Sequence, residues 1–374
     1  MRRRAYSVAA AVLAFLAAGR AALAGPLVPD DPKYSLEWYA QPGSPGTGLL
    51  GLPEAWGYST GDPGVIVAIL DTGVMTATPD LAGRLLPALS ATGTPPFSDA
   101  TLAAATILRH GTWVASVAAM GVNNGIGGAG VGNFSILPIT IAGIDGHNTG
   151  AWVAEGIRMA ADAGARVISC SHAVFPYKVV DDAAAYALTK GALVFMAGGN
   201  GNGWASRTGY DNLIFVSGTD QDDNRWDDGV AGGSTWGPFV DLAAPAEDVL
   251  AADPTLSTGY GLGDGTSFSA PLAAGAAALL WSINPSLTAA EVRGILYDTA
   301  VDLGDGGWDE VYGWGRLDIG AAAAAAHATV VPEPHTFGLM AAGAALALAR
   351  RRRLRRERAV RRRSDRLALA ADQP

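Results

Sequence analysis

The amino-acid sequence predicts an α/β fold with a doubly wound, mostly parallel sheet. Short apolar runs bounded by Gly, Asp or Asn recur along the chain, and such runs are typical of strands buried on both faces. Longer stretches with helical patterns separate them, and this alternation is typical of parallel sheets covered by helices. The chain has 374 residues, 49% of them hydrophobic, which is enough to build one large core.

The expected strands begin at residue 65 and are spread over most of the chain. They comprise residues 65–70, 136–141, 166–169, 193–197, 213–216 and 240–243. We expect helices at 150–163, 181–190 and 269–283. Thr288 and Glu291 form a capping-box pattern that opens another helix, and the alanine run 321–326 predicts the last one. Upstream, residues 25–62 are rich in Pro and Gly, and 42–46 predicts a loop.

The N-terminal residues 1–24 have the layout of a secretory signal peptide. Arg2, Arg3 and Arg4 precede the apolar residues 8–19, and small residues close the segment. We expect cleavage after Ala24. A membrane-anchoring helix is the weaker interpretation, because the apolar run is short compared with the ~20 residues of a membrane span.

The C-terminal residues 329–374 resemble the PEP-CTERM sorting signal of Gram-negative bacteria. They contain Pro-Glu-Pro at 332–334, an apolar run at 337–349 and an Arg cluster that starts at Arg350. The resemblance implies an exosortase-type processing enzyme as a partner, and delivery to the cell envelope or extracellular matrix. The apolar run is marginal as a permanent span, so the expected membrane contact is transient, with the Arg cluster on the cytoplasmic side. The alternative is an ordinary helix with a basic, solvated tail.

Charge and cysteine content narrow the function classes. The formal net charge is −9 although both ends are basic, so the middle of the chain is strongly acidic and is expected to repel nucleic acid. The single cysteine, Cys170, ends an apolar run and is expected to be a buried strand residue and not a reactive thiol. One cysteine forms no disulfide within the chain.

Three segments carry candidate groups for nucleophilic catalysis. Asp71 follows an apolar strand, His110 lies near an expected helix start, and Ser267 lies between a glycine-rich loop and a long helix. A serine hydroxyl becomes nucleophilic when a histidine takes its proton, and a buried carboxylate orients that histidine. Open α/β sheets collect such side chains at the carboxyl ends of their strands. Each segment alone is a weak signal, since Asp-Thr-Gly also occurs in turns and in aspartic proteases, and a lone His is more often structural.

In this order and context the segments resemble the subtilisin-like serine proteases, whose triad also runs Asp, His, Ser. Residues 193–200 resemble the family's oxyanion segment, with Asn200 at the matching position. Segments at 123–131, 240–245 and 312–318 extend the resemblance over roughly residues 31–328. The resemblance implies a three-layer α/β/α sandwich and, in residues 25–328, a catalytic domain that hydrolyses peptide bonds through an acyl-enzyme on Ser267.

Two places depart from the family pattern. Trp113 stands where the family often has a second histidine that is not catalytic. Residues 171–174, Ser-His-Ala-Val, replace the usual Ser-Leu-Gly-Gly, which lines the pocket for the residue before the cleaved bond. The resemblance marks Ser171 as a substrate-binding residue, and the replacement of the glycines is expected to narrow or reshape the pocket.

The resemblance also implies a structural calcium site. Asp80 and Asn124 fall on positions that resemble calcium ligands of the family, and oxygen donors suit this ion. No organic cofactor is expected. An acidic loop offers a second candidate ion site, but a solvated charged turn is the favoured interpretation. The loop contains Asp220, Asp222, Asp223, Asp227 and Asp228.

Three functional hypotheses follow from these patterns. The favoured one is a secreted serine endopeptidase that acts on proteins or peptides. The alternative is a catalytically idle protein of the same fold that binds envelope or matrix polymer, as the sorting signal and the altered pocket suggest. An esterase on another α/β fold is disfavoured, because Ser267 lacks the Gly-x-Ser-x-Gly context and the triad order would differ.

Overall fold

The computed structural model describes residues 25–42, 49–172, 178–230, 232–330 and 350. Contacts divide the chain into a compact unit of residues 23–327 and a second unit formed by residues 1–22 and 328–374. The fold described below is that of the first unit. The predicted signal peptide lies outside the described residues, as does the predicted sorting signal beyond Val330, apart from Arg350.

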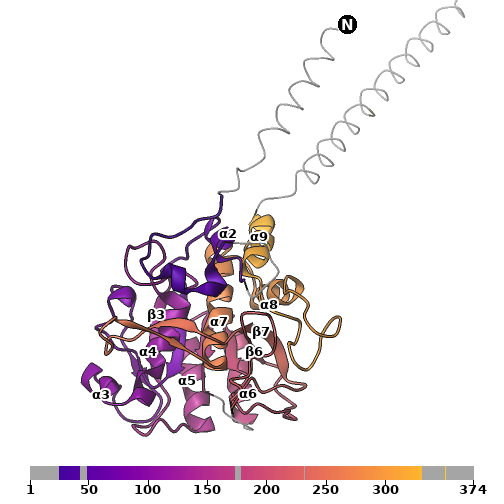
Figure 1. Cartoon of the computed structure of the whole chain (residues 1–374). Coiled ribbons are helices and arrows are strands. Elements are labelled where there is room, and N and C mark those ends of the chain that lie inside the picture. Colours follow the sequence, from indigo (N-terminus) through magenta and orange to yellow (C-terminus); the bar gives the residue numbers. More distant parts are fainter. Residues whose placement is uncertain (1–24, 43–48, 173–177, 231, 331–349, 351–374) are drawn as a thin grey trace, which may run out of the picture. The chain divides into compact units, whose positions relative to one another are not determined.

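The first unit is built on a parallel sheet of seven strands in the order β2-β3-β1-β4-β5-β6-β7 (Figure 1). All its strand pairs are parallel. The strands are β1 Ile66–Asp71, β2 Leu89–Ser90, β3 Ser135–Thr140, β4 Val167–Cys170, β5 Leu193–Ala197, β6 Leu213–Thr219 and β7 Val240–Pro245. Every strand expected from the sequence is present, and the short strand β2 was not predicted.

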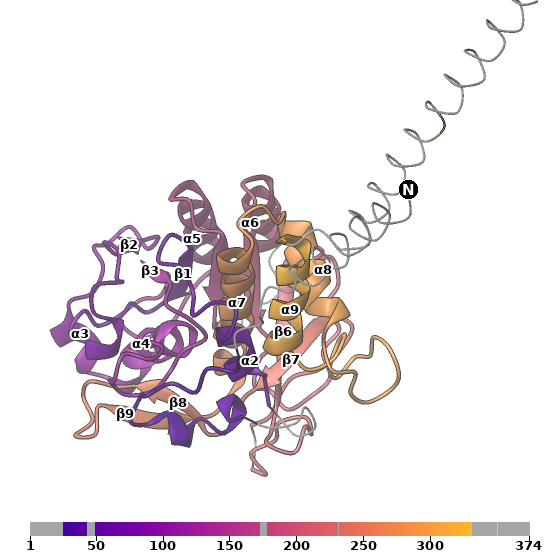
Figure 2. The same ribbon diagram turned by 90° about the horizontal axis from the view of Figure 1, so that it is seen from above.

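Helices cover both faces of this sheet. Helices α4 (Thr106–Ala119) and α7 (Thr266–Ile283) pack on one face, and α5 (Gly150–Asp162) and α6 (Lys178–Thr189) lie side by side on the other (Figure 2). Because side chains alternate along a strand, Ile69 of β1 joins the first core while its neighbour Leu70 joins the second. The predicted α/β/α sandwich is confirmed.

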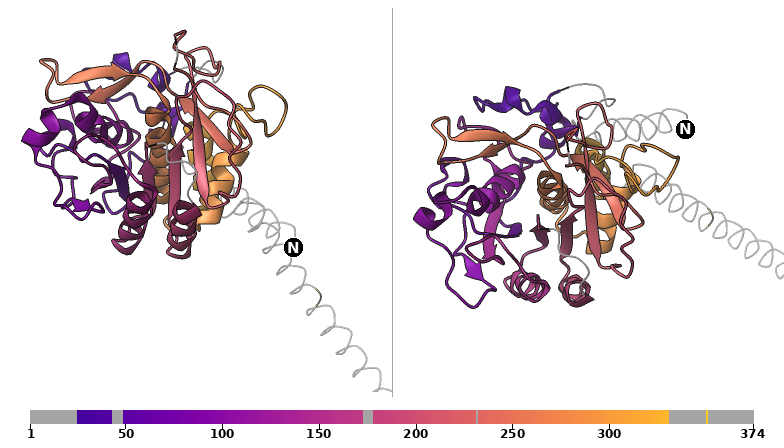
Figure 3. Two further views of the ribbon diagram at one scale, coloured as in Figure 1. Left: turned by 90° about the horizontal axis from the view of Figure 1, so that it is seen from below. Right: turned by 60° about the horizontal axis from the view of Figure 1, so that its bottom comes forward.

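Shorter elements complete the unit. An antiparallel hairpin of β8 and β9 packs beside α4 (Figure 3). This hairpin was not predicted from the sequence. The helical turns between residues 34 and 56 were also not predicted, because they lie in a region rich in Pro and Gly. These elements are β8 Val249–Ala252, β9 Tyr260–Gly263, η1 Tyr34–Leu36, η2 Trp38–Ala40, α2 Leu52–Trp56, η3 Pro79–Leu81, α3 Asp99–Ala103, α8 Ala289–Asp298 and α9 Ile319–Val330. The predicted capping box of α8 is present, with Thr288 and Glu291 bonded reciprocally.

The interior confirms one further expectation and shows where the most apolar helix lies. Cys170 is a fully buried residue of β4, and burial raises the pKa of its thiol to about 12. Helix α7 is long and apolar enough to cross a membrane by composition alone, but 83% of its most apolar window is buried within the protein. It is therefore the central helix of the core.

Candidate active site

The carboxyl end of β1 is the natural place for a site in this sheet. Strand β1 lies between β3 and β4, so successive connections from β1 lead to opposite sides of it. Open α/β sheets bind their ligands outside the strand ends at such a switch point. Asp71 is the last residue of β1, its side chain is fully buried, and its Oδ1 accepts a hydrogen bond of 2.8 Å from the amide of Thr72.

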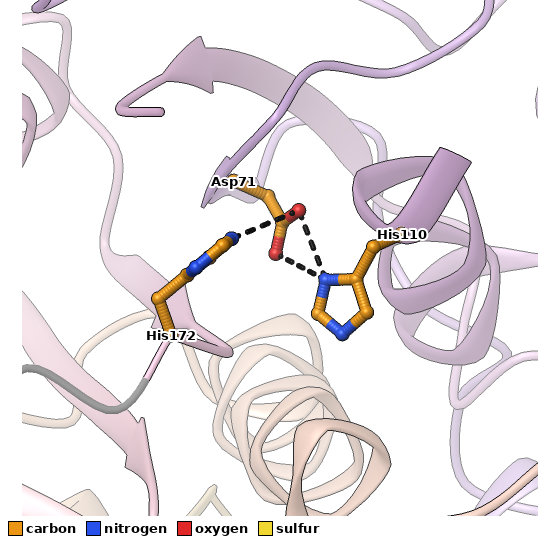
Figure 4. Close-up of side chains that lie close together, drawn as sticks. All are labelled: Asp71, His110 and His172. Atoms are coloured by element: carbon orange, nitrogen blue, oxygen red, sulfur yellow. Dashed lines mark hydrogen bonds and ion pairs between the residues drawn. The ribbon is translucent and has the colours of Figure 1, made fainter. Parts of the chain in front are cut away.

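Helix α4 brings His110 to this carboxylate. Nδ1 of His110 lies 2.9 Å from Oδ2 and 3.0 Å from Oδ1 of Asp71 (Figure 4). The helix approaches closely because residue 111 is glycine. A Cβ at Gly111 would lie 2.2 Å from the carbonyl oxygen of Gly73. The helix begins at Thr106, so His110 lies within the helix. The sequence had indicated a position nearer the helix start.

The electrostatics of Asp71 favour its charged form. Burial raises the pKa of this carboxyl, but the charges of His110 and His172 and the hydrogen bond from His110 lower it by more, so the net shift is strongly downward. Hydrogen-bonded cations at this distance favour the carboxylate. The charged form of Asp71 is therefore favoured at neutral pH.

Ser267 lies at the amino end of α7, directly after the loop that ends at Gly265. Its Oγ donates a hydrogen bond of 3.1 Å to the carbonyl oxygen of Ser171. The hydroxyl of Ser171 in turn donates to the carbonyl oxygen of Ser267 at 2.7 Å. Within the described residues, Ser267 makes no hydrogen bond with His110 in this conformation.

Asn200 lies beyond the end of β5 and against the same loop. Its Oδ1 accepts hydrogen bonds from the amide of Thr266 at 3.0 Å and from its hydroxyl at 2.7 Å. A Cβ at Gly265 would lie 2.8 Å from Nδ2 of Asn200, and Gly265 has a φ of 123°, so only glycine suits this position. The anchored oxygen leaves the amide nitrogen as a donor beside the amino end of α7.

Sequence reasoning missed one member of the site, His172. It was noted only as part of the altered pocket segment, yet its Nε2 lies 3.4 Å from Oδ1 of Asp71. Its ring centre lies 5.5 Å from that of His110. One carboxylate and two imidazoles thus converge within 4.8 Å. The pairing of Leu70 with Cys170 across β1 and β4 explains the contact, since Asp71 follows Leu70 directly and His172 lies two residues after Cys170 at the same edge.

The predicted pocket residue Ser171 is buried between β4 and α7. Its neighbours at 173–177 lie outside the described residues. The indole nitrogen of Trp113 donates to Asp253 at 3.1 Å.

The predicted calcium residues lie together. Nδ2 of Asn124 donates to Oδ1 of Asp80 at 2.9 Å. Two buried acids missed from the sequence belong to the same region: Asp31 accepts from three backbone amides of the loop that holds Asn124, and Glu37 accepts from Ala129. Oε2 of Glu37 is buried and has no hydrogen-bond partner among the described residues.

In the acidic loop at 220–228, several aspartates pair with arginines or accept hydrogen bonds from backbone amides. Asp223 forms an ion pair of 2.6 Å with the fully buried Arg316, and Asp227 lies 3.3 Å from Arg225. Asp220 accepts from the backbone amides of residues 222 and 224. These contacts agree with the favoured interpretation of this loop as a charged turn.

Comparison with known protein families settles the class of the molecule. The profile of the subtilase family matches residues 62–315, more than half of the chain. The chain belongs to the subtilase family. A second profile, the PEP-CTERM protein-sorting motif, matches residues 330–353 of this subtilase.

Individual relatives agree with this assignment. This subtilase is 36% identical over 278 residues to thermitase from Thermoactinomyces vulgaris, covering 73% of the chain and 91% of thermitase. It is 34% identical over 265 residues to subtilisin BL from Lederbergia lenta, covering 69% and 90%. Among solved structures, a protease from Pseudoalteromonas arctica superposes with a TM-score of 0.67 at 28% identity, covering 80% of this chain and all of that one.

These findings confirm the favoured hypothesis. This subtilase is an exported serine-type endopeptidase with the α/β fold of its family. Nothing in the comparisons favours the catalytically idle alternative.

Proposed function

We propose that Asp71, His110 and Ser267 are the catalytic triad of this endopeptidase and that Asn200 completes its oxyanion hole. The observation that carries the proposal is the bond of 2.9 Å between Nδ1 of His110 and the buried carboxylate of Asp71. This bond holds a proton on Nδ1 and leaves Nε2 as the base. Figure 4 shows this second nitrogen turned away from Asp71.

The chemistry then begins with the hydroxyl of Ser267. Because its Oγ donates to Ser171 in this conformation, the hydroxyl must leave this hydrogen bond before His110 takes its proton. Catalytic hydrogen bonds are often long or misaligned before substrate binds. The oxygen attacks the peptide carbonyl, His110 protonates the leaving amine, and water later cleaves the acyl-enzyme.

Two donors are placed for the negative charge that develops on the carbonyl oxygen. One is the backbone amide of Ser267, which also benefits from the positive amino end of α7. The other is Nδ2 of Asn200, whose side chain is anchored through Oδ1. Ser171 is the proposed substrate contact, because two hydrogen bonds hold it against Ser267.

Labelling tests the assignment of the nucleophile. A phosphonyl fluoride should modify Ser267 of the folded enzyme and abolish peptide cleavage, with the adduct located by mass spectrometry. The Ser267→Ala variant should unfold at the same temperature but bind no label. Casein cleavage by this variant, or an adduct at another serine, would overturn the proposal.

A structural calcium ion fits the acidic region around Asp80. Burial raises the pKa of Asp31, Asp80 and Glu37, and the charge of Asp31 raises the pKa of the other two further. A divalent cation would stabilise the charged forms of these three carboxylates. Carboxylate and amide oxygens are the ligands that calcium prefers. The proposed ligand set is therefore Asp80 and Asn124, joined by Asp31 and Glu37.

We extend the proposal to the export of this subtilase, on the basis of its N-terminal and C-terminal segments. The proposal is that residues 1–24 are a signal peptide, 25–328 the catalytic domain and 329–374 a sorting segment processed by an exosortase. The segment would cross the membrane only transiently and deliver the enzyme to a Gram-negative envelope or matrix. Mass spectrometry of the mature ends tests this. An intact tail on the secreted enzyme would contradict it.

A further inference from the structure

We propose that His172 is a positioning residue of the triad, whose Nε2–H faces Asp71 and thereby shares the carboxylate with His110. This inference rests on the proposed triad. It assigns a role to a side chain that stands where the family commonly has leucine, so the role belongs to this chain.

The neighbours of His172 determine which nitrogen carries its proton. Nδ2 of Asn148, in the loop after β3, lies 2.8 Å from Nδ1 of His172. An amide nitrogen only donates, so Nδ1 is the acceptor and the proton of a neutral ring is on Nε2. Were the amide of Asn148 turned around, a neutral His172 would aim a lone pair at the carboxylate of Asp71. The orientation that avoids two facing acceptors is the one in the structure.

The proton on Nε2 of His172 faces the carboxylate of Asp71. The atom is buried and forms no regular hydrogen bond with any described residue, and Oδ1 of Asp71 at 3.4 Å is its ion-pair neighbour. This separation exceeds that of an ordinary N–H···O bond, so the contact acts as a charge–dipole attraction. A second proton would have to lie on Nδ1, opposite the amide nitrogen of Asn148, so this contact favours the neutral ring, whose proton points at Asp71.

The charged and titratable groups around His172 come from three elements. Asp71 comes from β1 and His110 from α4, while the Sγ of Cys170 in β4 donates to the carbonyl oxygen of His172 at 3.7 Å. Burial lowers the pKa of His172, but the charge of Asp71 raises it by more, so the net shift is upward.

Sharing the carboxylate has a consequence for catalysis. An anion that already interacts with one imidazole attracts the proton of the second less strongly. Sharing the carboxylate therefore weakens the electrostatic pull of Asp71 on a proton bound to His110, and the pH dependence of catalysis reports this change.

The test is the pH profile of kcat/KM for a chromogenic peptide, measured on the mature enzyme. His172→Leu removes the donor and should shift the acidic limb to higher pH. We expect kcat/KM at pH 5 to fall about three- to tenfold relative to wild type, as a shift of half to one pH unit gives. At pH 9 the two enzymes should agree within about twofold.

The same profiles separate positioning from a structural role. A loss of equal size at every pH, or a change in KM alone, would mean that His172 only packs against the pocket and would overturn the proposal. So would a profile that overlays wild type. Retention of activity in Ser267→Ala would instead defeat the triad assignment, so the two failures are distinguishable.

A measurement on the unsubstituted ring covers the case in which His172→Leu fails to fold. Nitrogen NMR of Ser267→Ala at pH 9 should show a protonated Nε2 and an unprotonated Nδ1 for His172. The Asn148→Leu variant should mix the two tautomers. An unprotonated Nε2 in the Ser267→Ala protein would overturn the proposal.

Discussion

At the scale of single residues, the hydrogen bonds to Oδ1 of Asn200 determine which end of its amide faces the substrate. Both hydrogen bonds to Asn200 go to its Oδ1 and come from Thr266. The side chain can therefore offer its nitrogen to substrate without reorganising. This is the property required of an oxyanion donor, which must be in place before charge develops.

Replacement of Asn200 by leucine should lower kcat by about 10²–10³-fold, the loss known for such a donor in subtilisin, a member of this family. KM should change little, because the donor acts on charge that exists only in the transition state. Thr266→Val is the comparison variant: it removes one of the two anchoring bonds and the acceptor of the Gly199 amide, and it should still lower kcat much less. A rise in KM at constant kcat would contradict the assigned role of Asn200.

At the scale of elements, the approach of α4 to β1 sets the distance between His110 and Asp71. Gly111 permits this approach, because an added Cβ would meet the Gly73 carbonyl oxygen at 2.2 Å. Thr72 reinforces it by donating to the carbonyl oxygen of Leu108 at 2.8 Å. The loop after β1 and the helix are thus joined on both sides of His110.

Alanine at position 111 should therefore both destabilise the protein and impair catalysis. Backbone must move to accept the new methyl group, at a cost of about 1–3 kcal/mol, and the shift of α4 lengthens the bond between His110 and Asp71. Gly294→Ala is the matched control, since it lies in α8 with no neighbour within 4 Å of the added Cβ.

In that control, alanine should raise stability by roughly 0.5–1 kcal/mol, because it has the higher helix propensity. Thermal unfolding and kcat/KM measured on both variants check the pair. Equal effects of the two substitutions on unfolding temperature and on kcat/KM would show that close packing at Gly111 determines neither stability nor catalysis.

At the scale of the whole molecule, the acidic region around Asp80 joins segments that are far apart in sequence. Asp31 and Glu37 come from the N-terminal part, and the hydroxyl of Tyr260 in β9 donates to Asp80 at 3.1 Å. The buried carboxylates repel one another when no cation lies between them. A bound ion would therefore stabilise the folded state as a whole.

Removal of calcium by a chelator should lower the unfolding temperature by several degrees. A ligand at 100 times its dissociation constant stabilises a folded protein by about 2.7 kcal/mol. Calcium, added back, should restore the temperature. The Asp80→Asn variant should respond to neither treatment. Identical unfolding of the wild type with chelator and with calcium would rule out the proposed ion.

Much of this molecule could be predicted from local patterns. Apolar runs located the main strands, the pattern around residue 288 located the start of α8, and the position of Cys170 within an apolar run indicated its burial. The order and context of Asp71, His110 and Ser267 indicated the family, because glycines and strand ends around reacting groups have a local signature. Strand β2 was missed because two residues carry too little periodicity. The β8–β9 hairpin was missed because β9 alternates with glycine and was interpreted as part of a glycine-rich loop.

The amino-acid sequence by itself determined the family, the layered fold and the residues expected to perform the chemistry. Only the tertiary structure decided which further groups meet them. His172 reaches Asp71 because β3 and β4 flank β1 and the register of β1 with β4 brings two strand ends together. Asp31 and Glu37 reach Asp80 because the N-terminal segment packs against the loop at 121–129. Such contacts depend on long-range register and packing, which no local pattern of residues encodes.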